Sequence, residues 1–293
     1  MKKILLYLGF TFLFFSVVLF FLSNSSPKIK INAITQPAAV SAMAENAPAV
    51  KTFNILLIPG HEPKDGGGNY KNVYERDLAV DIADKISEIL TQDPKYKVII
   101  ARDKNDWNPT LKDYFENEKQ NIIDWKTQCQ KDNDALMLSG KIKPVPDMAF
   151  HSDATPEMSV RLYGMNKWAN ENGIDLVLNL HFNDSIRPNM NLPGLFKGFD
   201  IFVPESQLKN SVASHLAANE ISNELKKVEP PEVNHLLEDQ TLIALGASGT
   251  LNAPSMLIEY AYIYEKQLPV LQMAQQTALG IENYVSKTPQ TAN

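Results

Sequence analysis

Four residues in this chain have the right types to form a hydrolytic metal site, and each stands close to the end of a short apolar run or at the start of the segment that follows one. They are His61, Glu75, His181 and Glu259. Two imidazoles and a carboxylate are typical ligands of a zinc ion that keeps one coordination position open. A second carboxylate beside such an ion can serve as a base for attack by water.

The apolar runs before three of these residues predict how the chain positions them. The runs are Ile55–Ile58, Leu176–Leu180 and Ser255–Ile258. Each is mostly apolar and rich in branched residues, as is typical of a strand that is buried on both faces of a parallel sheet. Ligands of open parallel sheets bind outside the carboxyl ends of the strands. The polar residues that follow the three runs are therefore expected to meet at one edge of the sheet.

Each of these residues also has a structural interpretation when it is taken alone. A single histidine after a strand is more often structural than functional. Glu75 would be favourable as an acidic residue in the first turn of a helix. Glu259 could be a buried carboxylate paired with a cation, although burying such a group is costly. The combination of all four is what favours a metal site.

The rest of the chain alternates strands and helices. This pattern predicts an α/β fold with a twisted, mostly parallel sheet, helices on both faces and the zinc site at the carboxyl ends of the strands. The predicted elements are strand 54–60, helix 75–90, strand 96–101, helix 157–172, the strand before His181, strand 198–203, helix 210–227, strand 255–260, which is expected to close the sheet, and a helix from about 267 to 285.

Three motifs around the four residues occur in a recognisable order. They are Pro59-Gly60-His61 followed by Gly66-Gly67-Gly68 and Glu75, then Leu180-His181-Phe182-Asn183, and then Pro254-Ser255-Met256-Leu257-Ile258-Glu259. In order, spacing and strand context they resemble the zinc-dependent N-acetylmuramoyl-L-alanine amidases of the amidase 3 type, over about residues 54–285. The glycine run lacks the residues of a phosphate-binding loop, so a flexible connection between the first two ligands is the better interpretation.

The resemblance implies a role for each residue. His61, Glu75 and His181 take the positions of the ligands of one zinc ion, Glu259 takes that of the catalytic glutamate, and Asn183 is expected to contact the substrate. The implied reaction is hydrolysis of the amide bond between N-acetylmuramic acid and L-alanine of peptidoglycan. Glu259 would take a proton from water as general base and pass it to the leaving amine as general acid.

Two departures from the family pattern bear on the shape of the site. Phe182 stands where a small alanine is usual, which would narrow the site. After Glu259 the family usually continues with a glycine and a phenylalanine after one variable residue, whereas this chain has Tyr260-Ala261-Tyr262. This second change is expected to alter the substrate groove and to leave the chemistry intact.

Residues 104–156 are an insertion relative to the family's plan. Within it, a mostly apolar set has the spacing of one helical face: Leu111, Tyr114, Phe115, Glu118, Ile122 and Trp125. The segment Lys143–Asp147 is predicted to form a turn. Two interpretations remain open, either a lid or groove wall beside the zinc or a surface addition packed on the domain. His151, in the same insertion, is a further candidate for a metal or substrate contact.

The N-terminal part of the chain predicts an extracytoplasmic location. Lys2 and Lys3 precede the uncharged apolar run Ile4–Leu22, which is about long enough to span a bilayer. Residues 1–22 are therefore expected to form a membrane anchor rather than a cleaved signal, and residues 23–50 a flexible linker. Residues 51–287 would form one catalytic domain and 288–293 a tail.

Charge and the remaining residues exclude other classes of function. The formal net charge is -6 and no basic stripe is present, so nucleic acid is not an expected partner. The single cysteine, Cys129, is expected to be a buried small side chain. His215 and His235 are expected to be structural.

The rival functions are another zinc amidohydrolase or carboxypeptidase acting on cell-wall peptides and, with less support, a non-catalytic wall-binding module. The retained Glu259 argues against the last of these, since binding alone needs no base. Peptidoglycan is the expected substrate, and the sequence leaves open whether a protein activates the enzyme.

Overall fold

The computed structural model describes residues 52–146 and 154–288. The predicted anchor at 4–22, the predicted linker at 23–50, and His151 lie outside the described residues. Within the part that is described, none of the helices has the length and apolar character needed to cross a membrane. Residues 50–293 form one compact unit.

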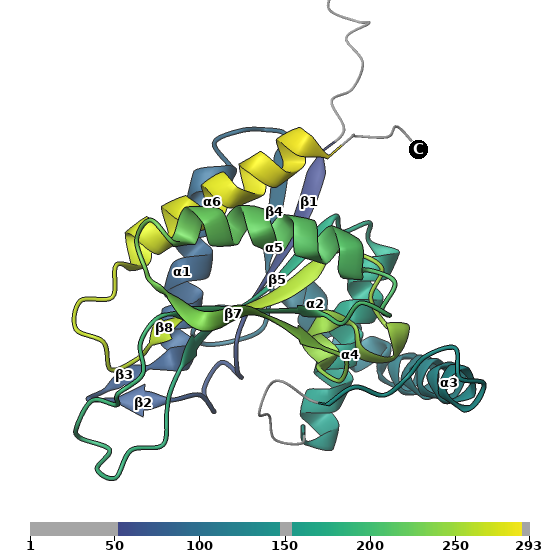
Figure 1. Ribbon diagram of the computed structural model, residues 1–293. Coiled ribbons are helices and arrows are strands. Elements are labelled where there is room, and N and C mark those ends of the chain that lie inside the picture. The colour runs from purple at the N-terminus through teal and green to yellow at the C-terminus, as the bar shows by residue number, and fades with distance from the viewer. Residues whose placement is uncertain (1–51, 147–153, 289–293) are drawn as a thin grey trace, which may run out of the picture. The chain divides into compact units, whose positions relative to one another are not determined.

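A six-stranded sheet forms the centre of this unit, with the strand order β4-β1-β5-β8-β6-β7 (Figure 1). The strands are β1 (Phe53–Pro59), β4 (Tyr96–Ile100), β5 (Leu176–Asn183), β6 (Phe199–Pro204), β7 (Pro231–Asp239) and β8 (Ser255–Tyr262). All neighbouring pairs are parallel except β6 and β8, which are antiparallel. The predicted twisted α/β fold with a mostly parallel sheet is confirmed.

Helices cover both faces of this sheet (Figure 1). One face carries α1 (Glu75–Leu90), α5 (Ser211–Leu225) and α6 (Val270–Lys287), and the larger apolar core lies beneath them. The other face carries α2 (Pro109–Asn117), α3 (Lys119–Leu138) and α4 (Pro156–Glu171), with a second, smaller core. Because β1, β5 and β8 are buried on both faces, their sequences are apolar almost throughout.

Strand register brings the ends of the predicted runs to one edge. Pro59 of β1 pairs with Leu180 of β5, and His181 of β5 pairs with Glu259 of β8. Residues that pair across adjacent strands project from the same face of a sheet. The register therefore places the base candidate directly beside one of the metal-ligand candidates.

Three features of the sheet differ from the sequence prediction. Strand β8 was expected to close the sheet but lies inside it, and the edge strands are β4 and β7. Strand β7 was not predicted, because its sequence mixes polar and apolar residues without a clear period. Its pairing with β6 is also irregular. A short hairpin of β2 (Asn69–Tyr70) and β3 (Val73–Tyr74), which leads into α1, was also not predicted.

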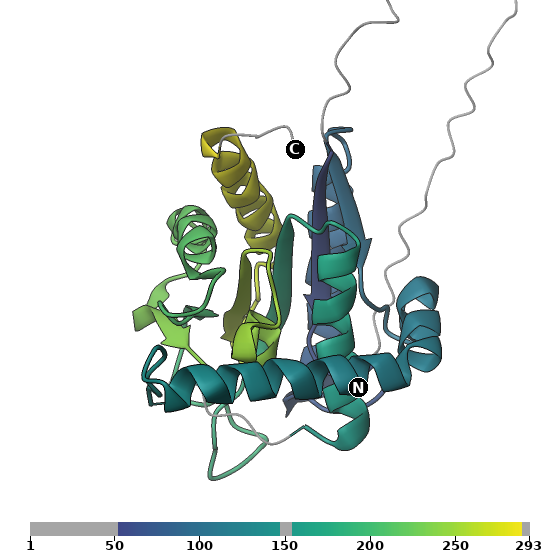
Figure 2. The ribbon, with the colours of Figure 1, turned by 90° about the vertical axis from the view of Figure 1, so that its right-hand side faces the viewer.

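The insertion forms two helices rather than one. The predicted continuous face over 111–125 is interrupted at Glu118, whose backbone leaves the helical region between α2 and α3. Figure 2 shows α3 side-on across the lower part of the domain. Leu111, Phe115 and Ile122 are buried in the smaller core, and Phe115 and Ile122 pack so closely on Gly164 of α4 that a larger side chain at Gly164 would collide with them. These contacts support the interpretation that the insertion packs on the domain.

Truncation of this buried stripe should destabilise the whole domain. Leu111 is fully buried, so Leu111→Ala is expected to lower the free energy of unfolding by about 2–5 kcal/mol. Leu138→Ala is the matched control, because Leu138 lies at the end of α3 and is 91% exposed, and its effect should stay within ~0.5 kcal/mol. Urea unfolding of residues 51–293 would measure both. Equal stability of the two variants would show that the insertion is not part of the core.

Candidate metal centre and active site

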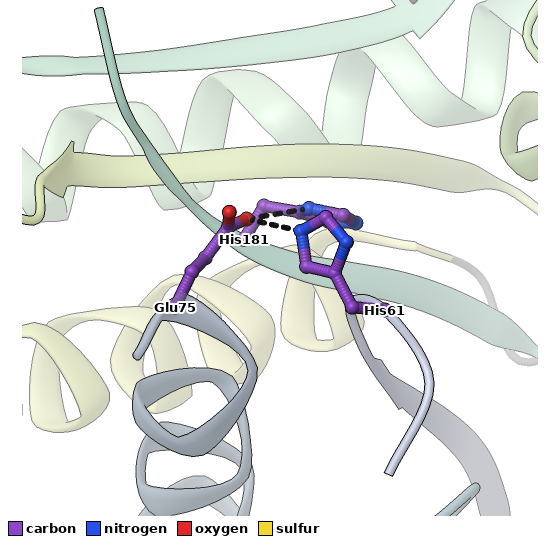
Figure 3. Close-up of side chains that lie close together, drawn as sticks. All are labelled: His61, Glu75 and His181. Carbon is purple, nitrogen blue, oxygen red and sulfur yellow. Dashed lines mark hydrogen bonds and ion pairs between the residues drawn. The ribbon is translucent and has the colours of Figure 1, made fainter. Parts of the chain in front are cut away.

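The structure brings three of the four predicted residues into direct contact (Figure 3). Glu75 Oε1 lies 2.8 Å from His61 Nε2 and 2.9 Å from His181 Nδ1. One ligand atom from each of the three residues lies within 4.8 Å of the other two. His61 comes from the loop after β1, Glu75 from the first turn of α1 and His181 from β5. The sequence prediction that these three residues converge is therefore correct.

Glu75 is held at the centre of this group by backbone and side-chain contacts. Its Oε2 accepts a hydrogen bond of 2.8 Å from the Gly68 amide, and its Oε1 accepts a weaker one of 3.3 Å from the Phe182 amide. Its carboxylate is buried. Burial acts to raise the pKa of Glu75, but the hydrogen bond with the imidazole of His181, the nearby imidazole of His61 and the charges of both rings hold it well below its usual range. Glu75 is therefore a carboxylate at every physiological pH.

Each of the two imidazoles has one feature that suits a metal ion. Burial lowers the pKa of His181, which favours the neutral form that binds metals. Among the described residues, His61 Nε2 is buried and has no hydrogen-bond partner of acceptable geometry, despite its short distance to the carboxylate. A buried imidazole nitrogen of this kind beside a carboxylate fits a zinc site.

Two glycines let the loop approach the group closely. A side chain at Gly60 would lie 2.3 Å from Cε1 of His181. Gly67 has φ +79°, and a side chain there would lie 2.9 Å from Cδ2 of His61. The glycines are thus needed for close packing and left-handed backbone, and not only for the flexible connection that the sequence suggested.

Arg102, at the end of β4, holds the loop that carries His61. Its side chain is almost fully buried, and the hydrogen bonds of its guanidinium to the described residues all go to backbone carbonyl groups. The acceptors are the carbonyls of Pro59 (3.2 Å), Gly60, His61 (2.8 Å), Arg76 (3.0 Å) and Asp103 (3.0 Å). Burial lowers the pKa of Arg102 to about 10, which still leaves it charged. The planar guanidinium has five donors in a fixed arrangement, which is what this set of carbonyls requires.

Glu259 lies beside the metal group, as its register with His181 requires. Its Oε2 is buried without a hydrogen-bond partner among the described residues. Burial, and then the charges of Glu75 and Asp200, raise the pKa of Glu259 well above its usual range. The side chain is thus a carboxyl group with unused hydrogen-bonding capacity next to the candidate metal ligands, which suits proton transfer.

Asp200 is a further acidic residue that the sequence prediction did not single out. It pairs with Glu259 across β6 and β8, is buried, and has one oxygen without a hydrogen-bond partner among the described residues. Burial, and then the charge of Glu232, raise its pKa to about 7. The signal in the sequence was an aspartate inside the apolar strand Phe199–Val203, where a charged residue is costly to bury.

The raised pKa of Asp200 predicts a pH-dependent stability. A carboxyl that binds its proton more tightly in the folded chain stabilises the fold at low pH, and this contribution is lost as pH rises from about 4 through 7. The Asp200→Asn variant lacks this titrating group. The difference between its free energy of unfolding and that of the wild type should therefore shift in favour of the variant by roughly 2–3 kcal/mol from pH 5 to pH 8. Urea unfolding at both pH values would measure this. The exposed Asp113→Asn is the control, and the same pH response in both variants would contradict the prediction.

Phe182 does not narrow the site, contrary to the expectation from the sequence. It points to the opposite face of β5 from His181, is fully buried in the larger core, and packs 5.7 Å from the ring of Tyr260. A strand alternates its side chains between faces, so the residue after a metal ligand faces away from the metal. Asn183, two residues after His181, is half-buried at the end of β5; its contact with substrate stays a prediction.

The other residues considered from the sequence lie apart from this group. His215 on α5 lies 3.2 Å from Glu238, and His235 on β7 packs its ring against Phe199. Neither belongs to the candidate metal group found among the described residues. Cys129 on α3 is half-buried, not fully buried as expected.

Comparison with known proteins agrees with the motifs. Residues 55–139 match the family model of N-acetylmuramoyl-L-alanine amidase, of the amidase 3 type. This segment includes His61 and Glu75. Among curated proteins, none matches the sequence at a significant level.

Solved structures of several amidases share the fold. The CwlD amidase from Clostridioides difficile, solved in complex with the GerS lipoprotein, has a TM-score of 0.54 at 16% identity, covering 81% of this chain and 100% of its own. The amidase Ami1 from Mycobacterium smegmatis has a TM-score of 0.54 at 12% identity, covering 82% of this chain and 99% of its own. The resemblance predicted from the motifs is confirmed: the chain carries the N-acetylmuramoyl-L-alanine amidase family segment within the fold of these enzymes.

Proposed function

We propose that this protein is a zinc-dependent N-acetylmuramoyl-L-alanine amidase that cleaves the bond between N-acetylmuramic acid and the first L-alanine of peptidoglycan. The observation that carries the proposal is the contact of His61, Glu75 and His181 with Glu259 in register beside them. The family match and the shared fold support amidase activity on the cell wall. Zinc dependence and the role of each residue are our own inference from the geometry.

In the proposed reaction, His61, Glu75 and His181 hold one zinc ion. When bound, zinc supplies Lewis-acid activation of water and of the scissile carbonyl. The buried Glu75 contributes a negative charge to the ligand set, and the guanidinium of Arg102 holds the backbone of Pro59–His61 so that the first imidazole keeps its position. The ligands are thus fixed before substrate arrives, which reduces the reorganisation that the reaction requires.

Glu259 moves the proton in this scheme. Its carboxylate accepts a proton from the attacking water and then donates it to the nitrogen of the leaving L-alanine as the amide bond breaks. A general base works best when its pKa lies near the operating pH. Burial and the neighbouring carboxylates shift the pKa of Glu259 upward from its usual value, in the direction that suits both steps.

The family's substrate implies that the protein acts outside the cytoplasm. We propose that the apolar run Ile4–Leu22 anchors it to the cytoplasmic membrane and that residues 23–50 tether the catalytic domain. The neighbouring CwlD amidase was solved with the lipoprotein GerS. By analogy, we propose that this chain also binds a protein partner.

Digestion of purified sacculi tests the proposed bond. Residues 51–293 with zinc should release peptides that have a free α-amino group on L-alanine, and should leave a free lactyl carboxylate on the glycan, as mass spectrometry would show. Products cut within the peptide would favour another zinc amidohydrolase or a carboxypeptidase. Binding to sacculi without any cleavage would favour a wall-binding module.

A further inference from the structure

The loop between β5 and β6 carries a concentrated set of exposed apolar side chains. We refer to residues 186–196 as the apolar loop. Five of its side chains are between 56% and 103% exposed, namely Ile186, Met190, Leu192, Leu195 and Phe196. In Figures 1 and 2 it is the teal-green loop that extends below the rest of the described domain. Exposed apolar side chains gathered in one place usually mark an interaction site.

Residues 186–196 expose no charged side chain, and the exposed Lys197 follows them directly. Arg187 is the only charged residue of the apolar loop, and the side chain is buried. One guanidinium nitrogen lies 2.7 Å from Asp184 Oδ2, and the group lies beside the rings of Tyr70 and Tyr264, at 5.3 Å and 5.1 Å from their centroids. The charge that would oppose transfer into an apolar medium is therefore paired within the protein.

Some backbone polar groups of the apolar loop are paired within the loop. Arg187 Nη1 donates to the carbonyls of Met190 and Leu192, at 3.4 Å each. The Leu192 amide donates to the carbonyl of Asn189 at 3.0 Å, and the Asn191 amide donates to its side-chain oxygen at 2.9 Å. The two prolines of the loop have no N–H group. Internal pairing of this kind lowers the cost of moving a loop from water to lipid.

On the proposed function, in which the run Ile4–Leu22 anchors the chain, a lipid surface lies within reach of the domain. The apolar run Ile4–Leu22 is predicted to enter a bilayer, and residues 23–50 link it to the domain. A flexible linker of about 30 residues spans on the order of 30 Å. The domain would therefore remain close to the bilayer that the N-terminal run enters, which makes lipid the occupant that the apolar loop meets at high effective concentration.

We propose that the apolar loop inserts its side chains into the surface of a lipid bilayer. Lipid requires apolar area, which the loop provides, and the proposed N-terminal anchor makes lipid the surface that the loop meets at high effective concentration. The base of the loop borders the metal group, since Asp184 packs on Gly68, whose amide binds Glu75. Entry of the apolar loop into the bilayer would thus determine which side of the active site faces the membrane.

Flotation with lipid vesicles tests the proposal without the N-terminal run. The experiment uses residues 51–293, which lie within the compact unit, with vesicles of phosphatidylcholine and phosphatidylglycerol. Ile186→Ser with Leu195→Ser removes two side chains that are 103% and 94% exposed. The control pair is Val233→Ser with Leu138→Ser, whose side chains are 99% and 91% exposed elsewhere on the domain.

We expect wild type and the control pair to float with the vesicles, and the loop pair to bind at least ~10-fold more weakly. Absence of vesicle binding by wild type would overturn the proposal, and so would equal binding by the loop pair. A loop pair that floats normally but no longer binds sacculi would assign the loop to the wall polymer instead. Sacculus digestion, measured separately, keeps this outcome distinct from failure of the proposed amidase activity.

Discussion

Glu259→Gln is expected to abolish most of the hydrolytic rate while leaving the metal site in place. The amide of glutamine keeps the shape of the side chain but cannot accept the proton of the attacking water. General acid–base groups contribute ~10²–10⁴-fold to rate, so kcat on sacculi should fall by at least that order. Zinc content and sacculus binding should not change, because Glu259 is not one of the three residues in mutual contact.

The same substitution should not unfold the protein. In the folded chain the carboxyl is buried, and its negative charge is opposed by those of Glu75 and Asp200. A neutral amide removes this repulsion, so the zinc-free variant should be at least as stable as wild type near neutral pH. Glu88→Gln, at an exposed position on α1, is the control for activity. Loss of zinc from Glu259→Gln would make Glu259 a ligand and would refute its assignment as the base.

The residues of the metal group could be predicted because each follows from a local pattern and one general rule. His181 and Glu259 come at the ends of apolar runs, and parallel strands bring such ends to a common edge. Glu75 stands at the start of a helix, where an acidic residue is itself expected. Local sequence and sheet topology were therefore enough to predict that these residues lie close together, whereas the role of each came from the family resemblance and stays a prediction.

Arg102 could not be predicted as a support of the site, because its partners are backbone carbonyls. Such acceptors carry no signature in the sequence, and those of Pro59 to His61 lie about 40 residues away along the chain. The position of Arg102 directly after an apolar strand did indicate that it would be buried, and a buried charged residue must find partners. The identity of those partners depends on the folded loop alone.

The helices of the insertion show a different limit. The spacing of Leu111, Phe115 and Ile122 correctly indicated a buried helical face. It did not indicate the break at Glu118, nor which surface covers this face. A helical stripe predicts that some apolar partner exists. It does not say whether the partner is α4, as the structure shows, or the groove beside the metal.

His61→Ala should remove the metal and with it the activity. Loss of even a residue that only orients a metal ligand typically costs 10–100-fold in affinity, so loss of a ligand itself should lower zinc affinity by more than ~100-fold. Competition with a chromogenic chelator would measure the affinity, and sacculus digestion the activity. His215→Ala is the matched control, because this histidine pairs with Glu238 outside the group and its loss should leave zinc binding unchanged.

A second variant separates loss of the ligand from distortion of the loop. His61 has a positive φ of 67°, a conformation that asparagine adopts more readily than alanine. His61→Asn should therefore preserve the backbone that Arg102 holds and still lose high-affinity zinc. Because imidazole ligands must be neutral to bind metal, zinc affinity of the wild type should also weaken as pH falls. If both variants bound stoichiometric zinc with wild-type affinity, His61 would not be a ligand and other residues would hold the metal.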